Sequence, residues 1–270
     1  MPWFMLPIFT AEALGADLET ACHVAAGLEI GRIAAGCLDE WQDHDTEGAL
    51  WQAIGPEQTV SLATGMIALS LLTLSHLVHL GAEPGLVIAL QREFEVTLLH
   101  MSAGQYADLG DELSLDDYET VAGAKSGALL RLGCRAGAIV AGGSAEIVER
   151  YGEFGYNLGI LVQVWNDIFG LAGVEGKNDA DHQRALPVLA AKAVDQCVER
   201  SEYRPDSVGV QTGQLYTVLQ LGLLYQRTSE ALGRCPAAGS LPRFLDQYDP
   251  GRLAEMMEQP HLQPEGDHGQ

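Results

Sequence analysis

Two short acidic stretches contain the side chains best suited to chemistry. The first is Asp39-Glu40-Trp41-Gln42-Asp43, at the end of a segment whose apolar residues have helical spacing. Asp39 and Asp43 are separated by about one helical turn, so their carboxylates project from the same face and can share divalent cations. Taken alone, such a string is more simply a solvated helix end.

The second stretch is Asn166-Asp167, whose polar side chains interrupt an otherwise apolar run. Gln163 precedes this pair and Glu175 follows it. Mg²⁺ prefers a few protein oxygens, several waters and phosphate ligands to an all-protein cage, so two sparse clusters facing a cavity would suit a diphosphate. The predicted metal ligands are Asp39, Glu40, Asp43, Asn166, Asp167 and Glu175, and the predicted catalytic residues are Asp39, Asp43, Asn166 and Asp167.

The segments that must position these clusters have the pattern of helices. Apolar residues recur at helical spacing, with many Ala and Leu, and no segment alternates as a strand does. The pattern covers residues 14–38, 57–80, 84–109, 115–140, 145–171, 187–200, 210–232 and 241–257. No fixed-period repeat or Gly/Ser/Pro-rich linker divides the chain, and only the polar tail at 259–270 is expected to be disordered. We therefore predict an all-α helical bundle formed by one domain over residues 1–258.

The charge balance excludes several kinds of partner. The chain of 270 residues contains 15 Lys and Arg against 37 Asp and Glu, which gives a formal net charge of -22. A surface that follows nucleic-acid phosphates, or a polybasic membrane patch, is inconsistent with this excess of acid, so any phosphate must be bound locally. The five cysteines are scattered without a CxxC pair, which indicates reduced thiols and a cytoplasmic protein.

One uncharged stretch, residues 58–82, is long enough to span a bilayer. Ser, Thr and His recur through it and no adjacent Lys or Arg anchors it, so we predict a buried central helix and no membrane span. His76 and His79 lie on one face of this segment, but no third ligand is nearby and core histidines are favoured over a metal site. The apolar N-terminus lacks the basic region of a secretory signal and is expected to belong to the fold.

Several strings between residues 104 and 189 resemble, in order and spacing, the motifs of the trans-isoprenyl diphosphate synthase (polyprenyl synthetase) family. The strings are Gly104-Gln105-Tyr106-Ala107-Asp108-Leu109, Tyr118, Lys125-Ser126-Gly127-Ala128-Leu129-Leu130, Tyr151-Gly152, Phe154-Gly155, Leu158-Gly159, Gln163-Val164-Trp165-Asn166-Asp167, Gly176-Lys177-Asn178-Asp179 and Leu186-Pro187. The resemblance covers roughly residues 34–191. It implies the helical isoprenoid-synthase fold around a central cavity, with residues 39–43 in place of the family's first DDxxD motif.

The same resemblance implies roles for further residues. Three side chains would contact the diphosphate of the substrate: Lys125, Lys177 and Gln163. The cavity would be lined by Ala34, Ala35, Trp41, Gln105, Trp165 and Phe169. The two alanines lie where the family limits chain length, and their small size implies a C15 or C20 substrate. The aromatic rings beside the motifs could face a carbocation, although packing is the more ordinary role. A cluster of Mg²⁺ ions and a homodimer are the family-level expectations.

The sequence also departs from chain-elongating members of the family. Those members hold isopentenyl diphosphate with paired arginines after the first motif and with a basic segment near the N-terminus. Here residues 44–48 read His-Asp-Thr-Glu-Gly, and the first 31 residues contain no Lys or Arg. A second diphosphate would therefore meet repulsion instead of bidentate arginine contacts. The second motif starts Asn-Asp, which is similar to the NSE motif of class I terpene synthases, although Gly170 and Glu175 depart from that motif.

These features predict a Mg²⁺-dependent class I terpene synthase. Diphosphate would leave an allylic C15 or C20 substrate, and the carbocation would cyclise in a water-poor cavity until proton loss or water ends the reaction. Two alternatives stay open. One is a prenyltransferase, either an isoprenyl diphosphate synthase or an enzyme that uses a non-isoprenoid acceptor. The other is a non-catalytic partner subunit of a prenyltransferase.

Overall fold

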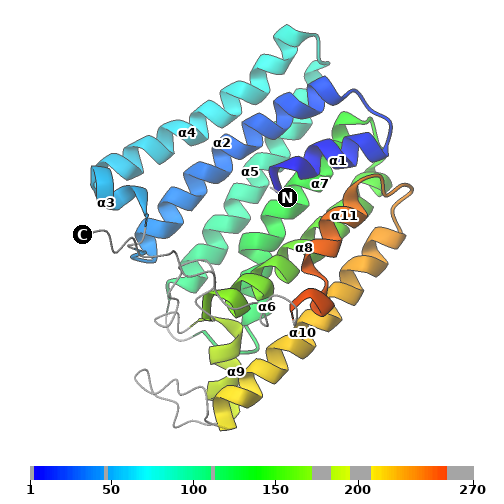
Figure 1. Cartoon of the computed structure of the whole chain (residues 1–270). Coiled ribbons are helices and arrows are strands. Elements are labelled where there is room, and N and C mark those ends of the chain that lie inside the picture. The colour runs from blue at the N-terminus through cyan, green and yellow to red at the C-terminus, as the bar shows by residue number, and fades with distance from the viewer. Residues whose placement is uncertain (1–2, 46–47, 111–112, 172–183, 195–207, 254–270) are drawn as a thin grey trace, which may run out of the picture.

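The regular secondary structure of the described residues is all helical, and no strand occurs among them (Figure 1). The computed structural model describes residues 3–45, 48–110, 113–171, 184–194 and 208–253. The elements in chain order are η1 (Trp3–Met5), α1 (Leu6–Ala13), α2 (Leu18–Gln42), α3 (Leu50–Ile54), α4 (Pro56–His76), η2 (Leu77–Leu80), α5 (Pro84–Asp108), α6 (Tyr118–Ala122), η3 (Gly123–Gly127), α7 (Ala128–Val140), α8 (Ala145–Leu171), α9 (Leu186–Val194), α10 (Val208–Gly233), α11 (Leu241–Leu245) and η5 (Asp246–Tyr248). The predicted all-α class is confirmed.

Helix α2 starts and ends later than the predicted 14–38. Gly15 has a φ of +72°, which breaks the preceding helix, and Asp17 then caps the new one by accepting from the N–H of Thr20 at 3.0 Å. The helix continues to Gln42, so Asp39 lies in its last turn instead of beyond its end.

The uncharged stretch forms α4 and η2 at the outer edge of the bundle, not a central helix (Figure 1). One face packs on α2, where Ser70 Oγ donates to the carbonyl of Gly27 at 2.7 Å. The opposite face leaves Leu62, Leu69 and Leu72 exposed by 46%, 49% and 65%. The predicted buried position is therefore wrong, because a hydropathy pattern does not tell core from apolar surface. By length and composition α2 and the α4–η2 stretch could each cross a membrane, a property that core helices of bundles share.

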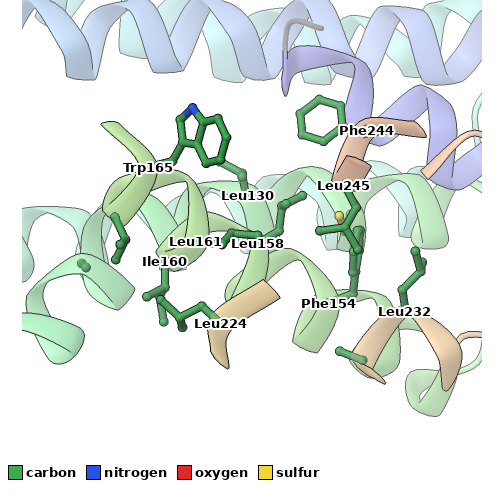
Figure 2. Packing of buried hydrophobic residues seen from close by; sticks show 14 of the residues in the cluster. Leu130, Phe154, Leu158, Ile160, Leu161, Trp165, Leu224, Leu232, Phe244 and Leu245 are labelled. Atoms are coloured by element: carbon green, nitrogen blue, oxygen red, sulfur yellow. The ribbon is translucent and has the colours of Figure 1, made fainter. Parts of the chain in front are cut away.

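The main hydrophobic core surrounds α8. Phe154, Leu158, Leu161 and Trp165 of this helix are buried among residues of α7, α10 and α11 (Figure 2). Each fully buried side chain of this size contributes roughly 1.5–3 kcal/mol relative to exposure. The packing makes α8 a fixed support for the polar residues near its carboxyl end.

The predicted helix at 115–140 is divided into α6, η3 and α7. The middle piece, η3, is a π-helical turn of five residues that contains Lys125. Such turns are rare and frequently occur at functional sites. Further along, the predicted helix at 241–257 is interrupted at Asp249, which precedes a proline and adopts an extended ψ of 123°, and residues 250–253 are helical again.

Candidate active site

The first acidic cluster lies at the carboxyl end of α2. Asp39 and Glu40 are in the last turn, and Asp43 ends the helix with its N–H donating to the carbonyl of Asp39 at 2.8 Å. This end of a helix carries partial negative charge, so carboxylates here are unfavourable unless a cation compensates them. Desolvation by the surrounding protein, reinforced by the Asp39 carboxylate, raises the pKa of Asp43. The cluster therefore favours the binding of cations.

The carboxyl end of α5 brings an amide and another acid to the same place. Gln105 Nε2 donates to Asp43 Oδ1 at 2.9 Å, and Asp108 is the last residue of the helix. Gln105 Oε1 is buried without a hydrogen-bond partner among the described residues. A buried acceptor of this kind needs a donor or a cation to satisfy it.

Lys125 connects the two helix ends. Its Nζ lies 3.1 Å from Asp39 Oδ1 and 2.8 Å from Asp108 Oδ2. Desolvation on its own would lower the pKa of Lys125, but the Asp39 and Asp108 carboxylates outweigh it and the pKa is raised. The ammonium is therefore charged at neutral pH. An ammonium has three donors, so one remains for an anionic ligand after these two contacts.

The π-helical turn η3 holds Lys125 in a narrow space between α5 and α8. A side chain at Gly104 of α5 or at Gly159 of α8 would collide with η3. Glycine at both positions therefore allows the close approach. While Lys125 points to the acidic residues, Ser126 Oγ donates to Gln163 Oε1 at 2.7 Å. One short turn thus contacts both predicted clusters.

The second cluster is built around a buried carboxylate. Asp167 accepts hydrogen bonds from Tyr118 Oη at 2.7 Å, Gln163 Nε2 at 2.9 Å and the N–H of Leu186 at 2.8 Å. Both carboxylate oxygens are engaged, and the residue is 9% exposed. Its neighbour Asn166 is exposed to solvent. Asp167 thus joins α6, α8 and α9, while Asn166 is the accessible member of the pair.

Arg184 belongs to the site although the sequence reasoning missed it. Its NH1 lies 3.2 Å from Asp108 Oδ1, and its NH2 donates to the carbonyl of Gly110 at 2.7 Å. Asp108 therefore holds two cations, Lys125 and Arg184. The scarcity of basic residues in the chain could have drawn attention to Arg184. However, a single arginine has no sequence pattern that predicts which acid it pairs with.

The other predicted residues that the structure describes lie on α2 and α8. Ala34 is buried between α2 and α4 in a small cluster with Cys37 and Ala63. Trp165 and Phe169 are in the main core, with ring centroids 5.2 Å apart. Glu40, Ala35 and Trp41 are partly buried on α2. The predicted Glu175 and Lys177 lie outside the described residues.

The donor set near Lys125 fits a sparsely held Mg²⁺ ion. No group of three or more His, Cys, Asp or Glu in the described ranges could hold a metal by itself. Mg²⁺ does not require one, since it binds through one or two carboxylates, waters and ligand phosphates. The side chain of Asp39 is 43% exposed. Asp43 is also exposed, and the buried Gln105 Oε1 offers a further acceptor beside it.

Comparison with known proteins places the chain in a family. The family model named Polyprenyl synthetase matches residues 10–201, which include both acidic clusters. The chain belongs to this family of trans-isoprenyl diphosphate synthases. A polyprenyl synthetase structure from Streptomyces coelicolor A3(2) covers 93% of this chain and 82% of its own, with a TM-score of 0.76 and 22% identity. The predicted isoprenoid-synthase fold is therefore confirmed.

Curated relatives include two kinds of prenyl-transferring protein. Geranylgeranyl diphosphate synthase of Mycobacterium tuberculosis is 28% identical over 196 residues, which are 67% of this chain and 55% of that protein. Tryptophan prenyltransferase ComQ of Bacillus subtilis is 28% identical over 162 residues, which are 58% of this chain and 50% of that protein. The chain thus spans about half the length of these relatives.

Proposed function

We propose that the chain transfers a prenyl group from an allylic prenyl diphosphate to an acceptor. The observation that carries this proposal is the junction of Asp39, Asp43 and Lys125 where α2 and α5 end, in a member of the polyprenyl synthetase family. The curated relatives are diphosphate synthases and a tryptophan prenyltransferase. They favour a prenyltransferase over the terpene synthase that the sequence alone predicted.

The residues of the junction suit the ionisation of the substrate. Mg²⁺ held by Asp39 and Asp43 would supply charge that neutralises the diphosphate. The remaining donor of Lys125 would bind a diphosphate oxygen and stabilise the negative charge that develops there. The carbon–oxygen bond breaks with both electrons leaving on diphosphate, so an allylic cation forms. An electron pair of the acceptor then makes the new bond to that carbon, and the acceptor loses a proton to solvent.

We propose further that the acceptor has no diphosphate of its own. The cations described at the site, Lys125 and Arg184, are both already paired with acids. The stretch after Asp43 contains acids in place of paired arginines. A second diphosphate would add negative charge where cations are already engaged. An electron-rich aromatic ring such as an indole avoids this repulsion, and the similarity to a tryptophan prenyltransferase supports that class.

The predicted terpene synthase activity has less support. Among the rings that could have faced its cation, those of Trp165 and Phe169 have the more ordinary packing role: they lie in the main core, and Trp165 meets Tyr248 edge-on at 5.7 Å. Cyclisation without an acceptor is therefore kept as an outcome of the test.

The test is incubation of the purified protein with Mg²⁺ and geranyl, farnesyl or geranylgeranyl diphosphate. Each donor is offered without acceptor, with isopentenyl diphosphate, and with a tryptophan-containing peptide, followed by mass spectrometry. A prenylated peptide is the expected product. The Asp39→Asn variant should not form it, whereas the control variant Glu57→Gln, which changes an exposed acid on α4, should still form it. Longer diphosphates alone would establish elongation, a terpene without acceptor would restore the synthase, and no product in any arm would favour the partner subunit.

We also propose that two copies associate through the outer face of α4. This face exposes Leu62, Leu69 and Leu72 by 46%, 49% and 65%. Exposed apolar residues gathered on one helix face are typical of a protein interface. The same patch on two copies would give a closed two-fold dimer.

A further inference from the structure

A cleft distinct from the acidic cluster opens between α5, η3, α7 and α8. Its volume is about 550 Å³, which is in the range of small-molecule sites. Its polar lining comes mainly from Arg92, Thr97, His100, Arg131, Arg135 and Tyr156. Among the described residues, neither Asp39 nor Lys125 lines it.

The cleft is basic within an acidic protein. Arg92, Arg131 and Arg135 line it with a single acid, Glu93, whereas the sequence has 15 basic residues against 37 acidic ones. Arg135 neutralises Glu93 through two hydrogen bonds of 2.7 Å. Arg131 and Arg135 also share Glu149, at 2.8 and 2.6 Å. Arg92 forms no ion pair in the described part of the chain.

Several donor groups in the cleft have no protein partner among the residues that the structure describes. Within the described ranges, the side chains of Arg92, Thr97, His100 and Tyr156 form no hydrogen bond. A guanidinium, hydroxyls and an imidazole are the groups that bind oxyanions, and an unpaired guanidinium can do so bidentately.

We propose that this cleft binds an organic oxyanion, a carboxylate or phosphate carried on a small organic body, with Arg92 as its main cation. Val96, Ala128 and the ring of Tyr156 supply apolar wall for that body. Glu93 does not repel the anion, because Arg135 already neutralises it.

The cleft shares a wall with the candidate active site. Gly123 and Ala124 of η3 line it, and the next residue is Lys125. Tyr156 packs against Gly123 and Gly127, where any side chain would collide with its ring. A ligand in the cleft therefore contacts the turn that positions Lys125, but its binding does not depend on prenyl transfer.

Isothermal titration calorimetry in metal-free buffer tests the site without turnover. The probes are inorganic diphosphate, N-acetyltryptophan as a carboxylate, and N-acetyltryptophanamide as its uncharged counterpart. Arg92→Ala removes the proposed cation. Arg243→Ala is the matched control, an exposed arginine on α11 without an ion pair in the described residues. Lys125→Met removes the cation of the acidic cluster.

Saturable binding of diphosphate or N-acetyltryptophan, but not of the amide, is expected. Its dissociation constant should rise roughly tenfold or more in Arg92→Ala and stay unchanged in Arg243→Ala and Lys125→Met. The probe that binds identifies a phosphate or a carboxylate as the source. If Arg92→Ala does not fold, as judged by circular dichroism, His100→Ala replaces it and should also weaken binding. The proposal is overturned if neither anion binds, if the amide binds as tightly as the acid, if the control weakens binding equally, or if only Lys125→Met abolishes it.

Discussion

Removing one hydroxyl from Tyr118 tests whether the Asp167 carboxylate joins three helices. Tyr118 is 6% exposed and donates to Asp167 Oδ2 at 2.7 Å. Tyr118→Phe keeps the ring and deletes the donor, while Gln163 and the N–H of Leu186 still donate. A hydrogen bond to a charged group contributes roughly 1.5–3 kcal/mol, so the free energy of unfolding should fall by about 2 kcal/mol.

Urea denaturation followed by circular dichroism measures this loss. A change of about 2 kcal/mol corresponds to a thermal midpoint lower by roughly 4–8 °C for a chain of this size. Burial, reinforced by Asp167, raises the pKa of the Tyr118 phenol well above its ordinary value. The phenol therefore stays protonated, and the effect should be the same at neutral and mildly alkaline pH.

The matched control is Tyr106→Phe, because Tyr106 is 83% exposed. Its effect should stay within about 0.5 kcal/mol. An equally small effect of Tyr118→Phe would refute the reasoning, since Asp167 would then be satisfied without Tyr118. A double-mutant cycle with Asp167→Asn should give a coupling energy of roughly 1–3 kcal/mol, and additivity would count against a direct bond.

Three further predictions concern chemistry, assembly and thiols. Lys125→Met should lower kcat of prenyl transfer by roughly 10²–10³-fold, as loss of a donor to developing charge does; an unchanged kcat in steady-state assays would exclude that role. Leu72→Asp should convert the dimer to a monomer in size-exclusion chromatography with light scattering, and an unchanged mass would place any interface elsewhere. Exposed Cys22 should react with iodoacetamide at about pH 8. Cys235 should not, since burial raises its pKa to about 11 and little thiolate forms; equal labelling by mass spectrometry would contradict this.

Local sequence signals were sufficient for much of the fold. Helix α5 was predicted at 84–109 and runs from Pro84 to Asp108, and α8 matches its predicted 145–171. Proline at the start of a helix and glycine after its end act through backbone geometry, which needs no tertiary partner. The acidic cluster at Asp39 and the family-like strings around Lys125 could be recognised for the same reason, because each is contiguous in the chain.

What the sequence could not supply is which partner each helix face meets. Ala34 was predicted to line the cavity, yet it packs toward α4 near Ala63. Its role in the cavity stays a prediction. Residue spacing fixes the angles between side chains of one helix, but it does not determine which neighbouring helix each side chain faces. The pairing of Arg184 with Asp108 depends in the same way on tertiary structure, across 76 residues of sequence.

The charge arrangement at the helix ends is unfavourable for local stability and is suited to ligand binding. Two helices end with acids, α2 at Asp39 and Asp43 and α5 at Asp108, where basic residues would be favoured. The described compensation is limited to Lys125 and Arg184. A structure that only needed to be stable would place these cations at each helix end separately. Because Lys125 and Arg184 lie near the ends of α2 and α5, positive charge is fixed beside carboxylate oxygens that are still open to solvent. That arrangement suits a magnesium diphosphate, whose cation and anion need both signs of charge within the same few ångströms.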